Sequence, residues 1–519
     1  MRNMKNNAVI LVILLAGTVA FASTASARWA RFSLIVGYNG SNDPELASLK
    51  YADDDAIKYA HVLQNVSEKS ILLTHMDKAS ARVFGAKKHK APTRQNILNA
   101  LTSLRKDMAV ARKRGDRPVL FFVYSGHGNY DQEGRGYVHL EDGHWTTRDL
   151  YYSVFGPTKG DNPHHVVLIA DACNAALLVN SRGSSQRRRV TGTSLKLESY
   201  PNVGVILSSS TVGEVHEWGK YLSGIFSHEI RSALLGPGDL NDDGEVGFAE
   251  LAAFVAAANA EIKNEIYRIK PYIRPPLSAP NLPIISLKDG HFPSRVRIGK
   301  DFAGKSHLIN GEMVRYVDFH KAAGHAFWMG IPGNGSFVVV HGDDEYVVPA
   351  GARGDLELSQ LEKRNRSVLS ARGPSAYYEK RLFSKPFGPA RAQSWLRDQY
   401  AKSLTVQRLE IEPWYANGRA WTLLGAGMAT LGGAAGFHAV AFQAHDDAQA
   451  AQWADERSAA NERAAQNEKI AAAMYSVGGA AAIGSVIWFA LDKRFKTVTY
   501  RPPIEVLLTP TGVQLKSQF

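Results

Sequence analysis

Short apolar runs alternate with amphipathic segments over the first half of the chain. The mostly apolar runs occupy residues 32–36, 70–73, 119–124, 166–170 and 203–207. Runs that are apolar on both faces are typical of central strands in a parallel sheet covered by helices. The segments 49–63 and 93–108 have helical spacing, and Thr93 fits a helix N-cap. The pattern predicts an α/β fold with a mostly parallel sheet flanked by helices.

The periodicity changes after a proline-rich stretch at residues 271–283. From about 290 to 400 the chain consists of short alternating segments, such as 295–298 and 337–340, punctuated by Gly and Asn. This alternation is typical of short strands joined by turns. We therefore expect a small β-rich domain after the α/β domain.

Two Gly- and Ala-rich apolar stretches follow, at 421–444 and 470–491, and each is long enough to span a bilayer. Gly432 and Gly436 have a small-xxx-small spacing that allows close helix packing. The segment 445–469 between the stretches is polar and favours helix. We expect a helical membrane hairpin, with a soluble helical hairpin as the alternative because Ala and Gly are weakly apolar. The positive-inside rule disfavours a topology with the α/β domain outside.

The N-terminus has the pattern of an export signal. Arg2 and Lys5 precede an apolar stretch at 8–22, and residues 25–27 form a small-x-small cleavage site. Export predicts a location in the cell envelope, with the α/β domain on the extracytoplasmic side; a retained signal anchor is the alternative. The predicted organisation is a signal peptide at 1–27, an α/β domain at 28–288, a β-rich domain at 289–405, a membrane hairpin at 415–495 and a tail at 496–519.

The 519-residue chain has a formal charge of +12 and one cysteine. Its basic residues are scattered, and no basic module interleaved with aromatic residues stands out, so no nucleic-acid partner is expected. One cysteine forms no internal disulfide, which is unusual for an exported chain. A lone thiol in an oxidising compartment is either buried and inert or has a chemical role.

Polar residues follow two of the longest apolar runs, as Ser125-Gly126-His127-Gly128 and Asp171-Ala172-Cys173. Carboxyl ends of neighbouring parallel strands meet at one edge of a sheet, where ligands bind. A thiol attacks a carbonyl as thiolate and needs a base within reach. The pattern predicts His127 as general base and acid and Cys173 as nucleophile, with no cofactor required. The backbone amides of Gly128 and Cys173 are the expected oxyanion donors; a turn histidine and a core cysteine are the alternatives.

These motifs resemble the caspase-like cysteine peptidases, which include metacaspases, orthocaspases and paracaspases. In that family an apolar strand precedes Ser-Gly-His-Gly, and a later strand precedes an acid-small-Cys triplet. Further segments agree with the family: Asp55-Ala56, 205–210, Gly213-Glu214 and 224–227. The resemblance covers about residues 30–285. It implies a caspase-like fold and an endopeptidase that acts on protein or peptide substrates.

The resemblance also implies a substrate pocket formed by Asp55, Ser125 and Asp171. In relatives with Asp at the position of Asp171, this pocket accepts Arg or Lys, because carboxylates bind a guanidinium with charge-assisted hydrogen bonds. We therefore expect cleavage after Arg or Lys, with Asp171 as a mere turn cap as the alternative. Relatives usually follow the cysteine with His-Ser-Gly, whereas this chain has residues 174–176, Asn-Ala-Ala. That departure would change the pocket wall or weaken the enzyme.

A polar basic segment at 180–189 follows the cysteine strand, where the family is cut between large and small subunits. The candidate self-cleavage residues are Arg182, Arg187, Arg188 and Arg189. A small, polar, basic composition favours an exposed loop. The alternative is a solvated loop that is never cut.

Residues 239–250 fit the calcium-loop pattern D-x-[DN]-x-[DN]-G-x5-E in full. Gly244 would make the sharp turn of such a loop, and the run 251–258 after it has helical character. The expected ligands are the side chains of Asp239, Asn241, Asp243 and Glu250 and the backbone carbonyl of Glu245. A relic loop that binds no calcium is the alternative.

Two other functions are compatible with the sequence. A catalytically inactive caspase-like scaffold that binds peptides in the envelope would explain the Asn-Ala-Ala sequence at 174–176. The intact pair His127 and Cys173 favours an enzyme instead. A legumain-like peptidase of the same broad clan would prefer Asn over Arg before the cleaved bond.

Overall fold

The computed structural model describes residues 27–519 except for short stretches, so the predicted signal peptide lies outside the described residues. The stretches not described after residue 27 are 160–162, 180–195, 209–216, 265–266, 289, 366–374, 404–405, 412, 492–494, 501–503, 510–511 and 518–519. The chain divides into two compact units, one made of residues 1–398 with 505–516 and the other of residues 399–504 with 517–519.

A six-stranded sheet with the order β12-β8-β7-β3-β1-β2 forms the centre of the first unit. Its first five strands in the chain run parallel: β1 (Trp29–Tyr38), β2 (Ser67–Thr74), β3 (Arg117–Gly126), β7 (His165–Asp171) and β8 (Val203–Leu207). The edge strand β12 (Tyr272–Arg274) pairs antiparallel with β8. The predicted mostly parallel sheet is confirmed, and the apolar runs form its strands.

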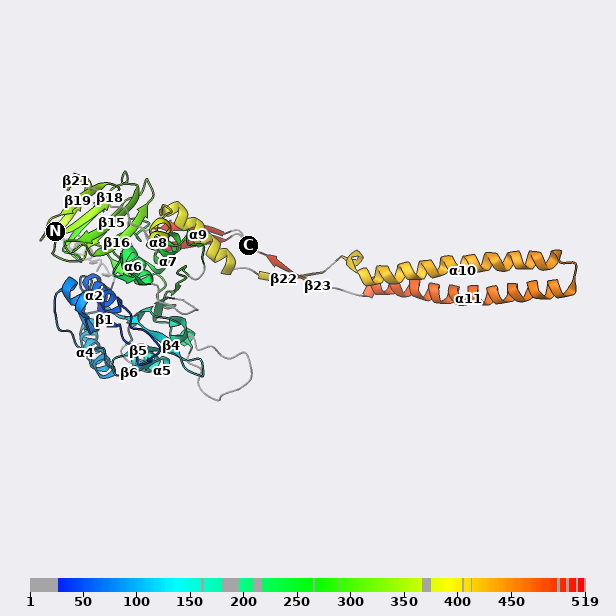
Figure 1. Ribbon diagram of the computed structural model, residues 1–519, viewed down its shortest axis with the longest axis horizontal. Helices are drawn as coiled ribbons and strands as arrows, with labels where there is room; N and C mark the ends of the chain where they lie inside the picture. The colour runs from blue at the N-terminus through cyan, green and yellow to red at the C-terminus, as the bar shows by residue number, and fades with distance from the viewer. Residues whose placement is uncertain are drawn as a thin grey trace, which may run out of the picture. The chain divides into compact units, whose positions relative to one another are not determined.

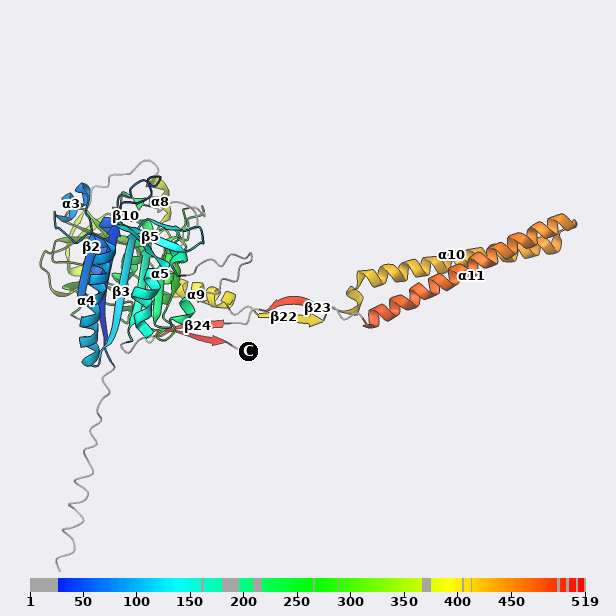
Figure 2. The same ribbon diagram turned by 90° about the horizontal axis from the view of Figure 1, so that it is seen from below.

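Helices cover both faces of this sheet. Side chains alternate along β1 and β3, so Ile35 and Phe121 enter one core while Leu34 and Phe122 enter the other. The helices of the first core are α2 (Ala52–Leu63), α6 (Ile225–Leu234) and α7 (Phe248–Ala258), and the second core is covered by α4 (Arg94–Lys113). Figure 1 shows α2 and α4 on opposite sides of β1, and Figure 2 shows α4 beside β2. The predicted N-cap of α4 is present, because Thr93 accepts a hydrogen bond from the Asn96 amide.

An excursion between β3 and β7 was not predicted from the sequence. It contains the antiparallel strands β4 (Gly128–Tyr130), β5 (Gly136–Leu140) and β6 (Gly143–Thr146), followed by α5 (Thr147–Leu150) and a π-helical turn at Tyr151–Phe155. Smaller elements elsewhere in this region are α3 (Lys78–Phe84), β9 (Glu217–Trp218), β10 (Ser223–Gly224), β11 (Glu245–Val246) and β13 (Ile285–Ser286). The excursion begins directly after His127, so it frames the end of β3.

Two further sheets form a β-rich region in the same unit. The first has the order β17-β14-β20 and the second β16-β15-β18-β19-β21. Their strands are β14 (Ser294–Ile298), β15 (Gly304–Asn310), β16 (Arg315–Lys321), β17 (Phe327–Ile331), β18 (Phe337–His341), β19 (Asp344–Val348), β20 (Gly354–Glu357) and β21 (Glu362–Asn365). The helices α8 (Ser375–Arg381) and α9 (Pro389–Ser403) follow.

One hydrophobic core runs through the α/β region and the β-rich region. It joins Phe226 of α6 to Phe319 of β16. Beside it, the His228 ring donates from Nε2 to Asp318, with 2.9 Å between Nε2 and Oδ2, and Arg315 forms an ion pair with the same carboxylate. Helix α6 is therefore held from both sides, by the sheet and by the β-rich region.

The second unit contains two long helices, α10 (Gly418–Ala450) and α11 (Ala454–Leu491), which lie side by side in Figures 1 and 2. Small residues spaced seven apart face each other along the pair: Ala420, Gly427, Ala434 and Ala441 are buried on α10, and Ser485, Gly478, Ala471 and Ala464 on α11. The Ser485 hydroxyl donates to the Ala420 carbonyl over 2.8 Å. A seven-residue repeat keeps one stripe of each helix in contact, as in a coiled coil.

The predicted packing face at Gly432 and Gly436 is wrong. A Cβ built on either glycine meets no atom within 4 Å, whereas one on Gly427 would lie 2.9 Å from the Ala482 amide nitrogen. The small residues that matter are therefore those of the seven-residue stripe. A spacing of four drifts away from this stripe as the helices wind around each other.

Both helices are long and apolar enough to cross a membrane by length and composition. Only 11% of the apolar window of α10 and 17% of that of α11 is buried within the chain. Trp421, Phe442, Ile483 and Leu491 are among the large apolar side chains left exposed. The strands β22 (Val406–Ile411) and β23 (Phe495–Tyr500) pair antiparallel, and β24 (Ile504–Thr509) pairs with β25 (Gly512–Ser517) in the C-terminal tail.

Candidate active site

The ends of β3 and β7 bring the two predicted catalytic residues to one edge of the sheet. Ser125 of β3 pairs in register with Asp171 of β7. His127 and Cys173 each follow two residues later, so they leave neighbouring parallel strands at the same level. A Cβ built on Gly128 would lie 2.4 Å from the Cys173 carbonyl oxygen, so the backbones after the two strands are in contact.

The His127 ring is held by a backbone carbonyl. Its Nε2 lies 2.9 Å from the Ala47 oxygen, and since a carbonyl only accepts, Nε2 carries the proton. In the neutral ring Nδ1 is then the basic nitrogen. Burial lowers the pKa of His127 below its usual value of 6.5, with a smaller opposing contribution from the Ala47 carbonyl. The ring is therefore a neutral base at pH 7.

Two side chains behind His127 fix the backbone around it. The Tyr124 hydroxyl lies 2.9 and 2.8 Å from the carbonyl oxygens of His127 and His139, and its one proton is shared between these two acceptors. The His139 ring lies 6.0 Å from the His127 ring between centroids, and burial lowers its pKa to about 4. Because His139 is neutral, a proton taken up by His127 is not repelled by a positive charge on the neighbouring ring.

Cys173 is half-buried and lies in the turn that leaves β7. The next residue, Asn174, has a φ of 56°. Asn adopts this left-handed conformation more easily than most side chains. The Asn-Ala-Ala sequence that departs from the family therefore fits its turn, and the short 3-10 helix Ala175–Leu178 follows it.

The Gly128 amide points away from its neighbouring strand. Gly128 pairs with Val138 of β5, while the His139 amide bonds the His127 carbonyl on one side of that pair. Gly128 is thus in a non-hydrogen-bonded position, where N–H and C=O face away from the partner strand. Its N–H is therefore not used in pairing with β5.

Two buried carboxylates meet beside the end of β7. A Cβ built on Gly224 would lie 2.7 Å from Asp171 Oδ2 and 3.2 Å from Asp55 Oδ2. Asp55 accepts hydrogen bonds from the Gly224 amide at 2.9 Å and from the Ser223 hydroxyl. Asp171 Oδ2 accepts from the Ser227 amide at 3.2 Å. Asp55 and Asp171 thus lie around Gly224 and the first turn of α6, while Ser125, which is also buried, is the register partner of Asp171 on β3.

Among the described residues, Asp55 has an ion-pair partner and Asp171 has none: Arg231 Nη1 lies 2.9 Å from Asp55 Oδ1. Burial, and then the charge of Asp55, raise the pKa of Asp171 to about 7. Lys58 is near, but its Nζ donates to the carbonyls of Tyr221 and Leu222, and burial together with Arg231 lowers its pKa to about 7. A further positive charge beside Asp171 would therefore stabilise the charged form of its carboxyl group.

One comparison with known proteins identifies the family of this domain. Residues 30–273 match the family model of the caspase domain, peptidase C14. The chain carries a caspase domain. Members of this family are cysteine peptidases. Among solved structures, pro-Sf-caspase-1 aligns with 48% of this chain and 87% of its own, at 13% identity and a TM-score of 0.27. The comparison with curated proteins gave no match.

Four of the predicted calcium ligands, Asp239, Asn241, Asp243 and Glu245, lie in the loop between α6 and α7 of the caspase domain, and Glu250 lies in the first turn of α7. Asp239 is fully buried, and burial with the charge of Asp243 raises its pKa to about 7. Glu250 caps α7, with its carboxylate bonded to the Gly247 and Leu240 amides. Within the described residues, no three His, Cys, Asp or Glu side chains already converge closely enough to hold a metal ion.

The candidate self-cleavage residues Arg182, Arg187, Arg188 and Arg189 lie outside the described residues, so self-cleavage stays a prediction. Three residues of the site escaped sequence reasoning: Ala47, Ser223 and Arg231. The signal for Arg231 was present, since an arginine in the middle of a segment with helical spacing has to find a partner once that helix is buried. Ala47 acts through its carbonyl, so its side chain gave no signal.

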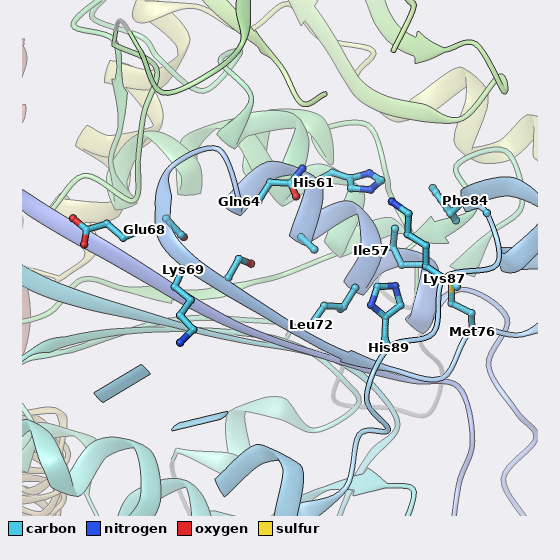
Figure 3. A pocket seen from close by; sticks show the side chains of 14 residues that line it. Ile57, His61, Gln64, Glu68, Lys69, Leu72, Met76, Phe84, Lys87 and His89 are labelled. Atoms are coloured by element: carbon cyan, nitrogen blue, oxygen red, sulfur yellow. The ribbon is translucent and has the colours of Figure 1, made fainter. Parts of the chain in front are cut away.

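A separate cavity of about 450 Å³ lies along α2 and the edge strand β2 of the caspase domain. Figure 3 shows His61, Lys69, Lys87 and His89 around it. None of the predicted catalytic or pocket residues lines it. His61 is already engaged there, with Nδ1 at 3.0 Å from the Tyr316 hydroxyl.

Proposed function

We propose that this chain is a cysteine endopeptidase that cleaves peptide bonds after Arg or Lys, with His127 and Cys173 as its catalytic pair. The observation that carries the proposal is the juxtaposition at one sheet edge: two residues beyond the paired Ser125 and Asp171, His127 and Cys173 leave adjacent strands. The membership of the caspase domain in a family of cysteine peptidases supports it.

The reaction follows from the atoms in the site. His127 Nδ1 accepts the proton of Cys173 Sγ, and the thiolate attacks the carbonyl carbon of the substrate. The amides of Gly128 and Cys173 donate to the oxyanion. The C–N bond breaks as His127 gives its proton to the leaving amine, and a thioester remains. A water molecule then gives a proton to His127, attacks the thioester and releases the acid, while Sγ takes the proton back.

Specificity for a basic residue rests on the charge around Gly224. Asp55 is compensated by Arg231, whereas Asp171 is held by the Ser227 amide within the same buried region. A guanidinium or ammonium group of the substrate that reaches Asp171 restores neutrality there. An acidic side chain in the same place would add a third carboxylate, which low-dielectric surroundings penalise strongly.

We also propose that the chain is exported and held at the membrane by α10 and α11. The helices touch along a narrow stripe of small residues and leave most of their apolar surface uncovered. Uncovered apolar helices of this length are stable in a bilayer. The signal-like N-terminus puts the caspase domain on the extracytoplasmic side.

Hydrolysis of fluorogenic peptides tests the enzymatic proposal. Peptides that differ only in the last residue, Arg, Lys, Asp or Asn, are compared on the full chain, with Cys173→Ala as the blank. We expect release after Arg and Lys and none after Asp. Preference for Asn would favour a legumain-like activity, and no hydrolysis of any peptide would favour the inactive scaffold.

The pH dependence separates the two titrating groups. Asp171 in the free enzyme has a pKa of about 7, so it loses charge as the pH falls, and KM for an Arg peptide should rise below pH 7. His127 has a pKa lowered by burial and stays neutral to more acidic pH, so kcat should persist where KM already rises. Initial rates measured between about pH 5.5 and 8.5 give both parameters. A flat KM with a falling kcat over this range would contradict the assignment.

A further inference from the structure

The loop between α6 and α7 is shaped like a calcium site although the caspase chemistry does not use it. Gly244 has a φ of 76° and Asp242 a φ of 58°, which turn the chain sharply back on itself. The Gly244 amide donates to Asp239 Oδ2 over 3.0 Å, and the Glu245 amide donates to Asp243 Oδ1 over 2.8 Å. These bonds direct both carboxylates toward the inside of the loop.

One buried oxygen in this loop has no bond to satisfy it. Asp239 is 0% exposed, and among the described residues its Oδ1 has no hydrogen-bond partner. A buried carboxylate oxygen without a donor is costly, unless a cation or an ordered water occupies the space in front of it. This unpartnered oxygen, together with the complete ligand pattern of residues 239–250, points to a cation.

The short strand β11 presents the backbone ligand. Gly244 and Val246 give their carbonyls to the amides of Leu287 and Ile284, at 2.7 and 2.9 Å. Since carbonyls alternate along a strand, the carbonyl of Glu245 between them points the other way, toward the loop. The carbonyl at this seventh position is the backbone ligand of a calcium loop.

The charges in the loop separate into two groups. The carboxylates that are not expected ligands are paired outside the loop: Asp242 with Arg297, and Glu245 with Lys288 at 2.8 Å. Among the described residues, the three expected ligand carboxylates have no such ion pair; they are Asp239, Asp243 and Glu250. The expected ligand carboxylates inside the loop therefore carry negative charge that no ion pair compensates, whereas the carboxylates on its outside are compensated.

We propose that this loop binds one Ca²⁺ through Asp239, Asn241, Asp243, Glu250 and the Glu245 carbonyl. Binding requires the Glu250 carboxylate to turn from the Gly247 and Leu240 amides toward Asp239. The loop joins α6, which carries Ser227 and Arg231 of the carboxylate pocket, to α7, and the Leu235 carbonyl at its start accepts from the Gly330 amide of β17 at 2.9 Å. The ion stabilises this junction.

Calorimetric titration of the full chain in mild detergent with CaCl₂ tests the proposal, and Cys173→Ala prevents self-cleavage, so the result does not depend on peptidase activity. We expect one site with a Kd between about 10⁻⁶ and 10⁻³ M, and a Tm several degrees higher at about 100 times that concentration. Asp239→Asn keeps an acceptor for the Gly244 amide but should weaken binding at least about tenfold, as should Glu250→Gln.

Asp242→Asn is the matched control, because it removes from the same loop a carboxylate that pairs with Arg297 and supplies no ligand. It should bind within about twofold of the parent chain. The proposal is overturned if the parent chain takes up no Ca²⁺ at millimolar concentration, or if Asp239→Asn and Glu250→Gln bind as the parent does. If Asp239→Asn does not fold, the double variant Asp243→Asn with Glu250→Gln replaces it. Binding like that of the parent chain would then overturn the proposal.

Discussion

Replacing Cys173 by Ala should abolish peptide hydrolysis by the caspase domain, with a loss of kcat of at least about 10⁴-fold. The thiolate is the only nucleophile that the proposed mechanism provides, and the chain has no second cysteine to replace it. His127→Ala should lose about as much, because an unassisted thiol is a poor nucleophile. Initial rates on the preferred peptide measure both losses.

The double variant distinguishes a catalytic pair from two independent structural residues. When two groups act in the same chemical step, replacing both lowers kcat no more than replacing one. The double variant Cys173→Ala with His127→Ala should therefore have the kcat of either single variant. His75→Ala is the matched control: its side chain is 71% exposed beyond β2 and lies 3.6 Å from the Glu141 carboxylate, so its loss should leave kcat unchanged. Hydrolysis that survives Cys173→Ala would refute the assignment of the nucleophile.

Asp171→Asn should reduce kcat/KM for an Arg peptide by about 10²- to 10³-fold, mainly through KM. The substitution removes the carboxylate that has no ion-pair partner among the described residues, while keeping an acceptor for the Ser227 amide. The folded chain should be no less stable, because Asn carries no charge to bury. Steady-state kinetics on Arg and on uncharged peptides should show that the preference for Arg is lost.

Glu229→Gln is the control for that change. Glu229 is a buried carboxyl on the same helix, and burial raises its pKa well above the usual value, so it is already neutral. Its carboxyl oxygens accept from Asn259 at 2.9 and 2.8 Å, and among the described residues they have no hydrogen bond to Asp55, Asp171 or Arg231. An equal loss of Arg preference in both variants would show that Asp171 acts through general packing and not through its charge.

The sheet and the catalytic edge could be predicted because their signals are local. Apolar runs mark strands that are buried on both faces, and equal spacing after two such strands brings His127 and Cys173 to the same edge. The approximate bounds of α2 and α4 followed from helical spacing in the same way.

The remaining parts depend on contacts between distant segments. Arg231 pairs with Asp55, which lies 176 positions away in the sequence. The Ala47 carbonyl accepts from His127, which lies 80 positions away. The strands β4 to β6 are short and polar, so their pattern resembled a loop. Helix α10 contacts α11 through the seven-residue stripe that includes Gly427. Gly432 and Gly436, which have the small-xxx-small spacing, lie outside this contact.

Covalent labelling of Cys173 tests the central claim most directly. The full chain is incubated with chloromethyl ketones that end in Arg or in Asp, and the adduct is located by mass spectrometry of peptides. Because the chain has one cysteine, a thiol adduct has one position. A single adduct on Cys173 should form rapidly with the Arg reagent and slowly with the Asp reagent, and after denaturation both reagents should react equally slowly. No adduct on the folded chain with either reagent, or equal rates with both, would contradict that claim.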